Sequence, residues 1–443
     1  MFQLYDKTRR RICVAAFLTL GVLPTLLVGG WCWSRHTWGC RQAEAEQLSR
    51  QLGLNVRLGG LKHLRPGVTL YEQFSAVDPE TGRPIFRCRL LEIARQTPSG
   101  APAKHRPTLL LTASQPEVDA ASLDRVWQCL QRSLAGLCGP LEADLRLSAA
   151  ELTLRAADNS QTLTEVKGMV ESLPDRTRAR LDFRLVGANA PEPAHICVDR
   201  NRQVSPPASG FELHTGGGEL PCSVLALGLS ELEPLGGHCR FRGIIWANET
   251  PDGWQGEVTG QLVDLDLGGL VSNHFPHKLS GAGEVTIDSA RFRHGRLEQG
   301  SALVVAGPGR IDRALLAAAV DRLGLAPATE PLPDGDLVEY KQLAFSATLD
   351  AQGLTLYGRC DAAEHGAILS DGRHRLLGES QRQPAPAVAL VQTLVPQSAV
   401  QVPASRQTDW LLHHLPVPEV MPLPGAQAVA PRAQVRLREA WQR

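Results

Sequence analysis

The chain has 443 residues, of which 43% are hydrophobic, and its 46 basic residues are balanced by 46 acidic ones. The sequence contains no long run of one charge sign, so it lacks the electrostatic footprint of a nucleic-acid-binding protein, and nucleic acid is not expected as a partner. A chain of this length can form two or three domains, or one extended β architecture with a substantial apolar interior.

An uncharged segment follows a basic cluster near the N-terminus. Four of residues 7–11 are Lys or Arg, and residues 12–34 contain no charged side chain. About 20 apolar residues are enough to cross a bilayer core, and flanking basic residues favour the cytoplasmic side. The pattern predicts a cytoplasmic stub and a single transmembrane anchor in residues 1–39, with the body outside the cytoplasm. A cleaved signal peptide is the alternative, although Trp31 and Trp33 stand where the small residues of a cleavage site are expected.

A short helix and then strands are predicted after the anchor. Ala45, Leu48 and Leu52 recur at helical spacing, and Gly53 stands where a C-terminal cap is expected. From Leu54 onward the hydrophobic residues alternate with polar ones, which is typical of half-buried strands.

The same alternation recurs far along the chain. Each such segment has one apolar and one charged face, which is typical of an antiparallel sheet covered on one side only. The clearest examples are residues 141–156, 178–187, 260–270, 283–292 and 341–358. The sequence therefore predicts a mainly β fold, with an extended or curved antiparallel sheet that has one apolar face.

Helices, loops and a tail interrupt or follow these strands. Amphipathic helices are predicted over residues 117–137 and 310–325, and we expect both to pack on the apolar face. Residues 97–107 and the proline-rich residues 190–210 are predicted to be loops. From about residue 371 the sequence is rich in Pro, Gln and Ala, so residues 371–443 are predicted to be mostly disordered, although the apolar run AVALVQTLV could form a short docking strand or helix.

These predictions divide the chain into four parts. They are the anchor (1–39), a juxtamembrane helix with a first β-rich region (40–210), a second β-rich region (211–370) and the tail (371–443).

The sequence offers little support for catalysis or metal binding. It has no P-loop, GxSxG, HExxH or intact GxGxxG motif, and its ten cysteines form no CxxC or zinc-site spacing. Asp264 and Asp266 could share a cation or a proton, but a solvated strand face is favoured. His274 and His277 flank Pro276 and are expected in a surface turn. We therefore expect no catalytic residue, no metal ligand and no cofactor, and a hydrolase with unrecognised residues is the remaining enzymatic alternative.

One cysteine pair is a candidate disulfide. Cys222 and Cys239 flank a segment that could form a hairpin around residues 234–237 and bring the two side chains together. The alternative is that both are small buried hydrophobic residues.

The order of these features resembles one protein family. A membrane helix and a short helix precede LGLNVRLGGLKHLRPGVTLYEQF and DPETGRPIF, and the Gly-punctuated strands LSGAGEVTIDSARFRHGRLEQGSALVVAGPGRI follow. Over about residues 11–360 this pattern resembles the AsmA-like proteins of the bacterial envelope. The resemblance implies an inner-membrane-anchored periplasmic protein with a β-rich groove that binds or organises phospholipid for envelope maintenance. The chain is short for that family, so it is not expected to bridge two membranes alone.

An apolar strand face gives this implication a physical basis, because it can shield acyl chains from water. The candidate lipid-facing residues are Val263, Leu265, Leu267, Val285, Ile287, Leu343 and Phe345. The alternative is an anchored adaptor with a closed β-sandwich and no lipid cargo, in which these side chains meet a second sheet. In either case the tail could bind envelope proteins.

Overall fold

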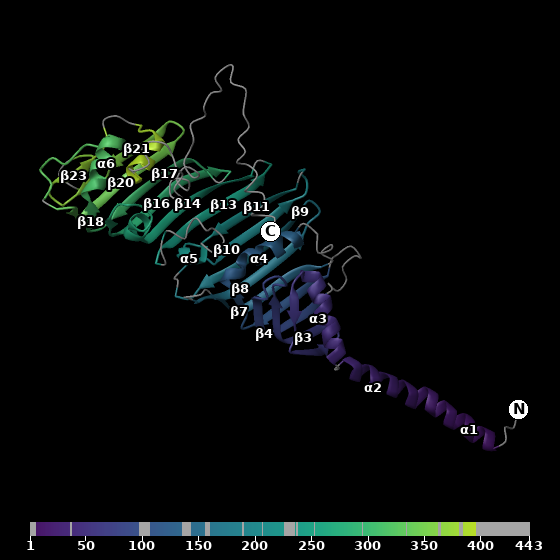
Figure 1. Cartoon of the computed structure of the whole chain (residues 1–443). Helices are drawn as coiled ribbons and strands as arrows, with labels where there is room; N and C mark the ends of the chain where they lie inside the picture. The colour runs from purple at the N-terminus through teal and green to yellow at the C-terminus, as the bar shows by residue number, and fades with distance from the viewer. Residues whose placement is uncertain are drawn as a thin grey trace.

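The computed structural model is dominated by one long sheet (Figure 1). It describes residues 6–35, 38–96, 107–134, 143–155, 160–187, 190–205, 207–225, 235, 238–251, 253–294, 296–333, 335–361, 365–380 and 384–395. Figure 1 shows the sheet as a twisted ribbon, with the N-terminal helices projecting from one end and β23 at the other.

The N-terminal segment is helical. It consists of α1 (Asp6–Phe17), a π-helical turn η1 (Leu18–Val22) and α2 (Leu23–Arg35). Residues 10–30 have a mean hydropathy of 2.3 and none of this stretch is buried, as expected for a membrane span or a signal sequence. The π-helical turn lies just before Pro24, which lacks an N–H, and Thr25 Oγ1 donates to Gly21 O at 2.7 Å.

Helix α3 (Trp38–Leu52) joins this segment to the body. It ends at Leu52, and the next residue, Gly53, has a φ of 68° that suits a residue without Cβ, so the predicted short helix and its glycine cap are confirmed. Tyr71 OH donates to Glu44 Oε1 at 2.9 Å, which ties α3 to β3.

The main sheet contains twenty strands. They are β1 (Asn55–Arg57), β2 (Gly60–Arg65), β3 (Val68–Val77), β4 (Pro84–Gln96), β5 (Thr108–Ser114), β6 (Glu117–Asp119), β7 (Asp144–Arg155), β8 (Ser160–Ser172), β9 (Arg176–Leu185), β10 (Ala194–Asn201), β11 (Ala208–His214), β12 (Leu220–Pro221), β13 (Arg240–Thr250), β14 (Gly253–Asp266), β16 (Ala282–Arg293), β17 (Arg296–Ala306), β20 (Gln342–Asp350), β21 (Gly353–Gly358), β22 (Ala367–Ser370) and β23 (Arg375–Gly378). Almost all pairings are antiparallel, which confirms the predicted fold class.

Strand order largely follows the chain. The sheet starts at β1 and β2, which both pair with β3, and continues through β4 to β23, with only β15, β18 and β19 left out. Strands β5 and β6 pair in parallel with β7, because the connection that contains α4 (Leu123–Leu134) crosses over between them. The sheet runs without a break through residues 210 and 211, between the two predicted β-rich regions.

A small second sheet is formed by the extended ends of three main-sheet strands. It contains β15 (Leu279–Ser280), β18 (Gly309–Asp312) and β19 (Leu337–Tyr340), which adjoin β16, β17 and β20 in the chain. A Cβ on Gly309 would lie 1.9 Å from Ser280 O, so only glycine fits at this bend.

Helices α6 and α7 follow the small sheet in the chain. In α6 (Arg313–Leu323), Asp312 accepts from Ala314 N at the N-terminus and Gly324 caps the C-terminus, so the predicted second helix is confirmed within three residues at each end. Helix α7 (Ala387–Leu394) is the docking helix that the apolar run suggested. His277 Nε2 donates to Thr393 O at 3.0 Å and holds the end of α7.

Three predictions about helices, loops and the tail were wrong. Residues 190–210, predicted to be a loop, contain β10 and the start of β11, because their prolines lie before or between strands whose residues alternate. Residues 117–122 form β6 and a 3-10 turn, η2 (Ala120–Ser122), so the helix begins only at Leu123. Residues 371–380 and 384–395 contain β23 and α7, so the tail was predicted to start too early in the chain; residues 396–443 lie outside the described part of the chain.

The docking of α7 gives a first prediction. Val391 is 3% exposed whereas Val388, on the same helix, is 50% exposed. Val391→Ala should lower the free energy of unfolding by about 1–3 kcal/mol through lost burial and a cavity, and Val388→Ala should change it by less than about 0.5 kcal/mol. Thermal and denaturant melts of the two variants test this; equal effects would mean that α7 does not pack as described.

Candidate functional site

One face of the main sheet is apolar, and this apolar character continues across the sheet from strand to strand. Directly paired residues of neighbouring strands point to the same face, so the strand register defines that face. Three cross-strand rows make up this apolar face: Tyr71, Leu91, Ala113, Ala149 and Val166; Leu181, Ile196, Leu213, Ile245 and Val258; and Leu262, Val285, Val304 and Phe345.

The opposite face, here called the polar face, carries ion pairs. Arg180 Nη2 lies 2.8 Å from Asp182 Oδ1, and Arg242 Nη2 lies 2.6 Å from Glu219 Oε1. These side chains are partly exposed, so the pairs contribute more to solubility than to stability. The alternation seen in the sequence therefore separates an apolar from a charged side in three dimensions.

Two β-bulges keep the apolar face in register. Glu165 and Asp264 have φ angles of 52° and 57°, and the pairing of their strands shifts at both positions. At the second bulge Val263 and Asp264 together oppose one residue of β16, so Leu262 and Leu265 point to the same side. Val263 pairs with Arg240 and lies on the polar face.

The structure brings six of the seven predicted lipid-facing residues onto the apolar face. Val263 is the exception, because strict alternation was assumed through a bulge. Leu265 and Leu267 are 2% and 5% exposed and belong to the hydrophobic core. The half-buried members are Val285, Ile287, Leu343 and Phe345. The part of the apolar face that is open to a ligand is therefore narrower than the sequence suggested.

Helices cover parts of the apolar face. Trp127 of α4 packs edge-to-face on Phe211 of β11, with ring centroids 6.1 Å apart, and Leu130 contacts the cluster of Ala179 and Val198. This confirms that the first predicted helix packs on the apolar face.

Further along the sheet, the end of α6 covers the face at β21. Leu323 and Leu325 line a small space together with Leu354 and Leu356 of β21. Between α4 and α6, residues of the apolar face such as Val258, Leu262, Val285 and Val304 stay half-buried in the part of the chain that is described.

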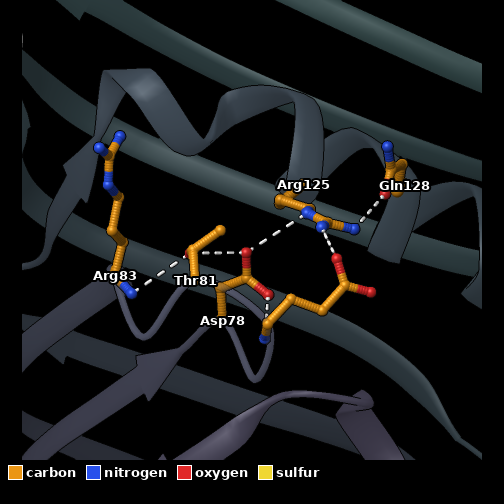
Figure 2. Close-up of polar contacts among 6 residues, drawn as sticks. Asp78, Thr81, Arg83, Arg125 and Gln128 are labelled. Carbon is orange, nitrogen blue, oxygen red and sulfur yellow. Dashed lines mark hydrogen bonds and ion pairs between the residues drawn. The ribbon is translucent and has the colours of Figure 1, made fainter. Parts of the chain in front are cut away.

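A polar cluster holds α4 across the sheet (Figure 2). Arg125 Nε of α4 lies 3.4 Å from Asp78 Oδ2 in the turn between β3 and β4, and its guanidinium also pairs with Glu80. Asp78 further accepts from Glu80 N at 3.1 Å and from Thr81 Oγ1 at 2.8 Å. Near its other end, α4 meets β11 where Ser209 Oγ donates to Gln131 Oε1 at 3.2 Å. Sequence reasoning missed this cluster, because it joins residues that are remote in the chain.

The charge of Asp78 gives a prediction on pH dependence. Burial favours the neutral acid, but the hydrogen bonds from Glu80 and Thr81 and the charge of Arg125 outweigh it and lower the pKa of Asp78. A carboxyl whose pKa is lower in the folded state stabilises the fold above its unfolded pKa, and this contribution is lost as the pH falls through the folded pKa. Asp78→Asn should therefore lower the free energy of unfolding by about 1–3 kcal/mol at pH 7 and by progressively less below about pH 4.

The matched control is Asp321→Asn on the exposed side of α6, which should change the stability by less than about 0.5 kcal/mol. Denaturant melts between pH 3 and pH 7 measure both variants. A difference between wild type and Asp78→Asn that stays constant over this range would show that the Asp78 charge does not stabilise the turn.

The candidate catalytic residues do not form a catalytic arrangement. Asp264 and Asp266 share the polar face as predicted; both are exposed, Arg240 Nε lies 4.0 Å from Asp264, and Asp266 accepts from Gly268 N. His274 is half-buried, and His277 is 3% exposed, so the predicted surface turn was wrong for His277. Among the described residues no group of His, Cys, Asp and Glu could hold a metal ion.

A cavity of about 540 Å³ lies beside the ends of β9, β12 and β13. Its lining includes Arg240, Arg242 and Glu219, and Glu219 pairs with both arginines. Because the carboxylate already neutralises part of their charge, the cavity is not a strong anion site.

Comparisons with models of protein families, with curated proteins and with solved structures found no match for this chain.

Proposed function

We propose that this protein is a membrane-anchored, extracytoplasmic protein of the AsmA-like type that binds phospholipid acyl chains on the apolar face of its main sheet. In this proposal residues 10–30 span the inner membrane and the body lies in the periplasm, because the basic cluster precedes the span. No catalytic step is required, since holding acyl chains away from water needs only apolar surface.

The observation that carries the proposal is the continuity of the apolar face. The twenty strands occupy sixteen positions, because β1 and β2, β5 and β6, β11 and β12, and β21 and β22 each share one position. At a strand spacing of about 4.8 Å, the sheet extends about 70 Å from its first position to its last. In the described residues the small sheet has only three short strands, so it faces too little of the main sheet to make a closed sandwich.

The energetics favour a lipid ligand for a body tethered to a membrane. Each buried CH₂ contributes about 0.8 kcal/mol, so an acyl chain of about 16 carbons gains on the order of 10 kcal/mol on leaving water. The valine, leucine and phenylalanine side chains of the apolar face between α4 and α6 are half-buried, and their exposed parts offer such a chain an apolar surface.

Native mass spectrometry of the full chain extracted in mild detergent tests the proposal. The protein should retain phospholipid, identified by its mass and by fragmentation. A cooperatively folded protein that carries no phospholipid, but that retains an envelope protein, would favour the adaptor function over lipid binding.

A further inference from the structure

Two cysteines lie next to each other where β12 and β13 pair. Cys222 begins the short helix α5 (Cys222–Leu225) directly after β12, Cys239 directly precedes β13, and the neighbouring residues Pro221 and Arg240 are paired. Cys222 N donates to Cys239 O at 2.8 Å, and the two Sγ atoms lie 3.2 Å apart. The turn that the sequence predicts around residues 234–237 lies, except for Leu235, outside the described part of the chain.

The backbone spacing at this position suits a covalent bond. The hydrogen bond from Cys222 N to Cys239 O continues the β12–β13 ladder by one residue. Opposed residues of such a ladder have Cα atoms about 4.5–5.5 Å apart, which lies within the range of about 4.4–6.8 Å found in disulfides. Both side chains are only 1% exposed, so small thiols and disulfides reach them only when this part of the fold opens locally, and a bond once formed is sheltered from reductants. We propose that Cys222 and Cys239 form an intramolecular disulfide that closes the segment of residues 223–238.

The chemistry requires an oxidant, which we take to be a small disulfide such as oxidised glutathione. Cys222 Sγ–H donates to Cys239 Sγ; this hydrogen bond, together with burial, raises the pKa of Cys222, and it lowers the pKa of Cys239. The Cys239 thiolate attacks one glutathione sulfur and releases the first glutathione thiolate. Cys222, on losing its proton, then attacks Cys239 Sγ and releases the second. Two electrons and two protons pass from the cysteines to two molecules of glutathione.

The bond would also fix part of a cavity wall. Pro221 and His238, which directly precede the two cysteines in the chain, both line the cavity of about 540 Å³. In the cell the bond depends on the extracytoplasmic placement of the body that is part of the proposed function, because cytoplasmic thiols stay reduced.

Peptide mapping of the full chain tests the disulfide. The protein, extracted from membranes in detergent, is incubated with oxidised glutathione, denatured, alkylated without reduction and cleaved after glutamate. Cleavage at Glu219, Glu231 and Glu249 places the two cysteines on different peptides, 220–231 and 232–249, so only a disulfide keeps these peptides joined. We expect the joined peptides and alkylation of eight of the ten cysteines.

Two variants test whether the bond joins these two cysteines. Cys222→Ser should leave Cys239 alkylated and abolish the joined peptides, whereas Cys197→Ser on β10 should leave them unchanged. Separate, alkylated peptides from folded wild-type protein after oxidation would overturn the proposal. Joined peptides that appear only after oxidised glutathione is added would support the bond and count against the extracytoplasmic placement.

Discussion

Val304→Asp is expected to lower the amount of phospholipid that co-purifies with the protein by about tenfold or more. Val304 is half-buried in the row of Leu262, Val285 and Phe345 on the apolar face, so an ionised carboxylate at this position would be forced against acyl chains. A tenfold change corresponds to about 1.4 kcal/mol, well below the cost of burying an unpaired charge. Lipid per protein, measured by mass spectrometry, provides the readout.

The neighbouring residue supplies the control. Val305 is the same residue type on the same strand, but it points to the polar face and is 41% exposed. Val305→Asp should retain the lipid and the melting temperature of the wild type. If both variants lose lipid equally, the loss reflects damage to β17 and not a ligand on the apolar face. If Val304→Asp retains all its lipid, that row does not contact acyl chains.

Leu213→Ala is expected to lower the free energy of unfolding by about 2–5 kcal/mol, the largest stability effect among these variants. Leu213 is 2% exposed and pairs with Ile196 and Ile245 near the middle of the main sheet. Truncation there leaves a cavity among side chains that cannot close around it. Leu213 therefore belongs to the fully buried part of the apolar face, whereas Val304 belongs to its half-buried part.

The adjacent Glu212 is the matched control for this variant. Its side chain is 53% exposed on the polar face, so Glu212→Ala should change stability by less than about 0.5 kcal/mol. Denaturant unfolding of both variants gives the two free energies directly. A small effect of Leu213→Ala would show that this part of the apolar face is not tightly packed.

Local patterns in the sequence predicted several of the strands. The alternation of apolar and polar residues can be read from residues that are adjacent in the sequence. For this reason the sequence predicted β7, β9, β14, β16 and β20. The bulge at Asp264 could not, because a single extra residue is visible only in the pairing with β16. That bulge is also the reason why Val263 was assigned to the wrong face.

Predictions were wrong where they relied on proline content instead of on the alternation of apolar and polar residues. Proline-rich stretches were predicted to be loops or disordered tail, yet the prolines near residues 191–207 lie outside the strands, and β10 and β11 carry alternating residues such as Ile196, Val198, Phe211 and Leu213. Contacts between remote residues, such as Arg125 with Asp78 or His277 with Thr393, have no signal in a single sequence.

The most direct test of lipid binding is site-specific photocrosslinking in membranes. A photoreactive phenylalanine analogue replaces Phe345 on the apolar face or, as the control, Tyr357, which is 50% exposed on the polar face of the adjacent strand β21. After irradiation, intact-protein mass spectrometry should detect phospholipid adducts at position 345 and few or none at position 357. Protein adducts at position 345, or equal lipid labelling at both positions, would contradict the binding of acyl chains on the apolar face.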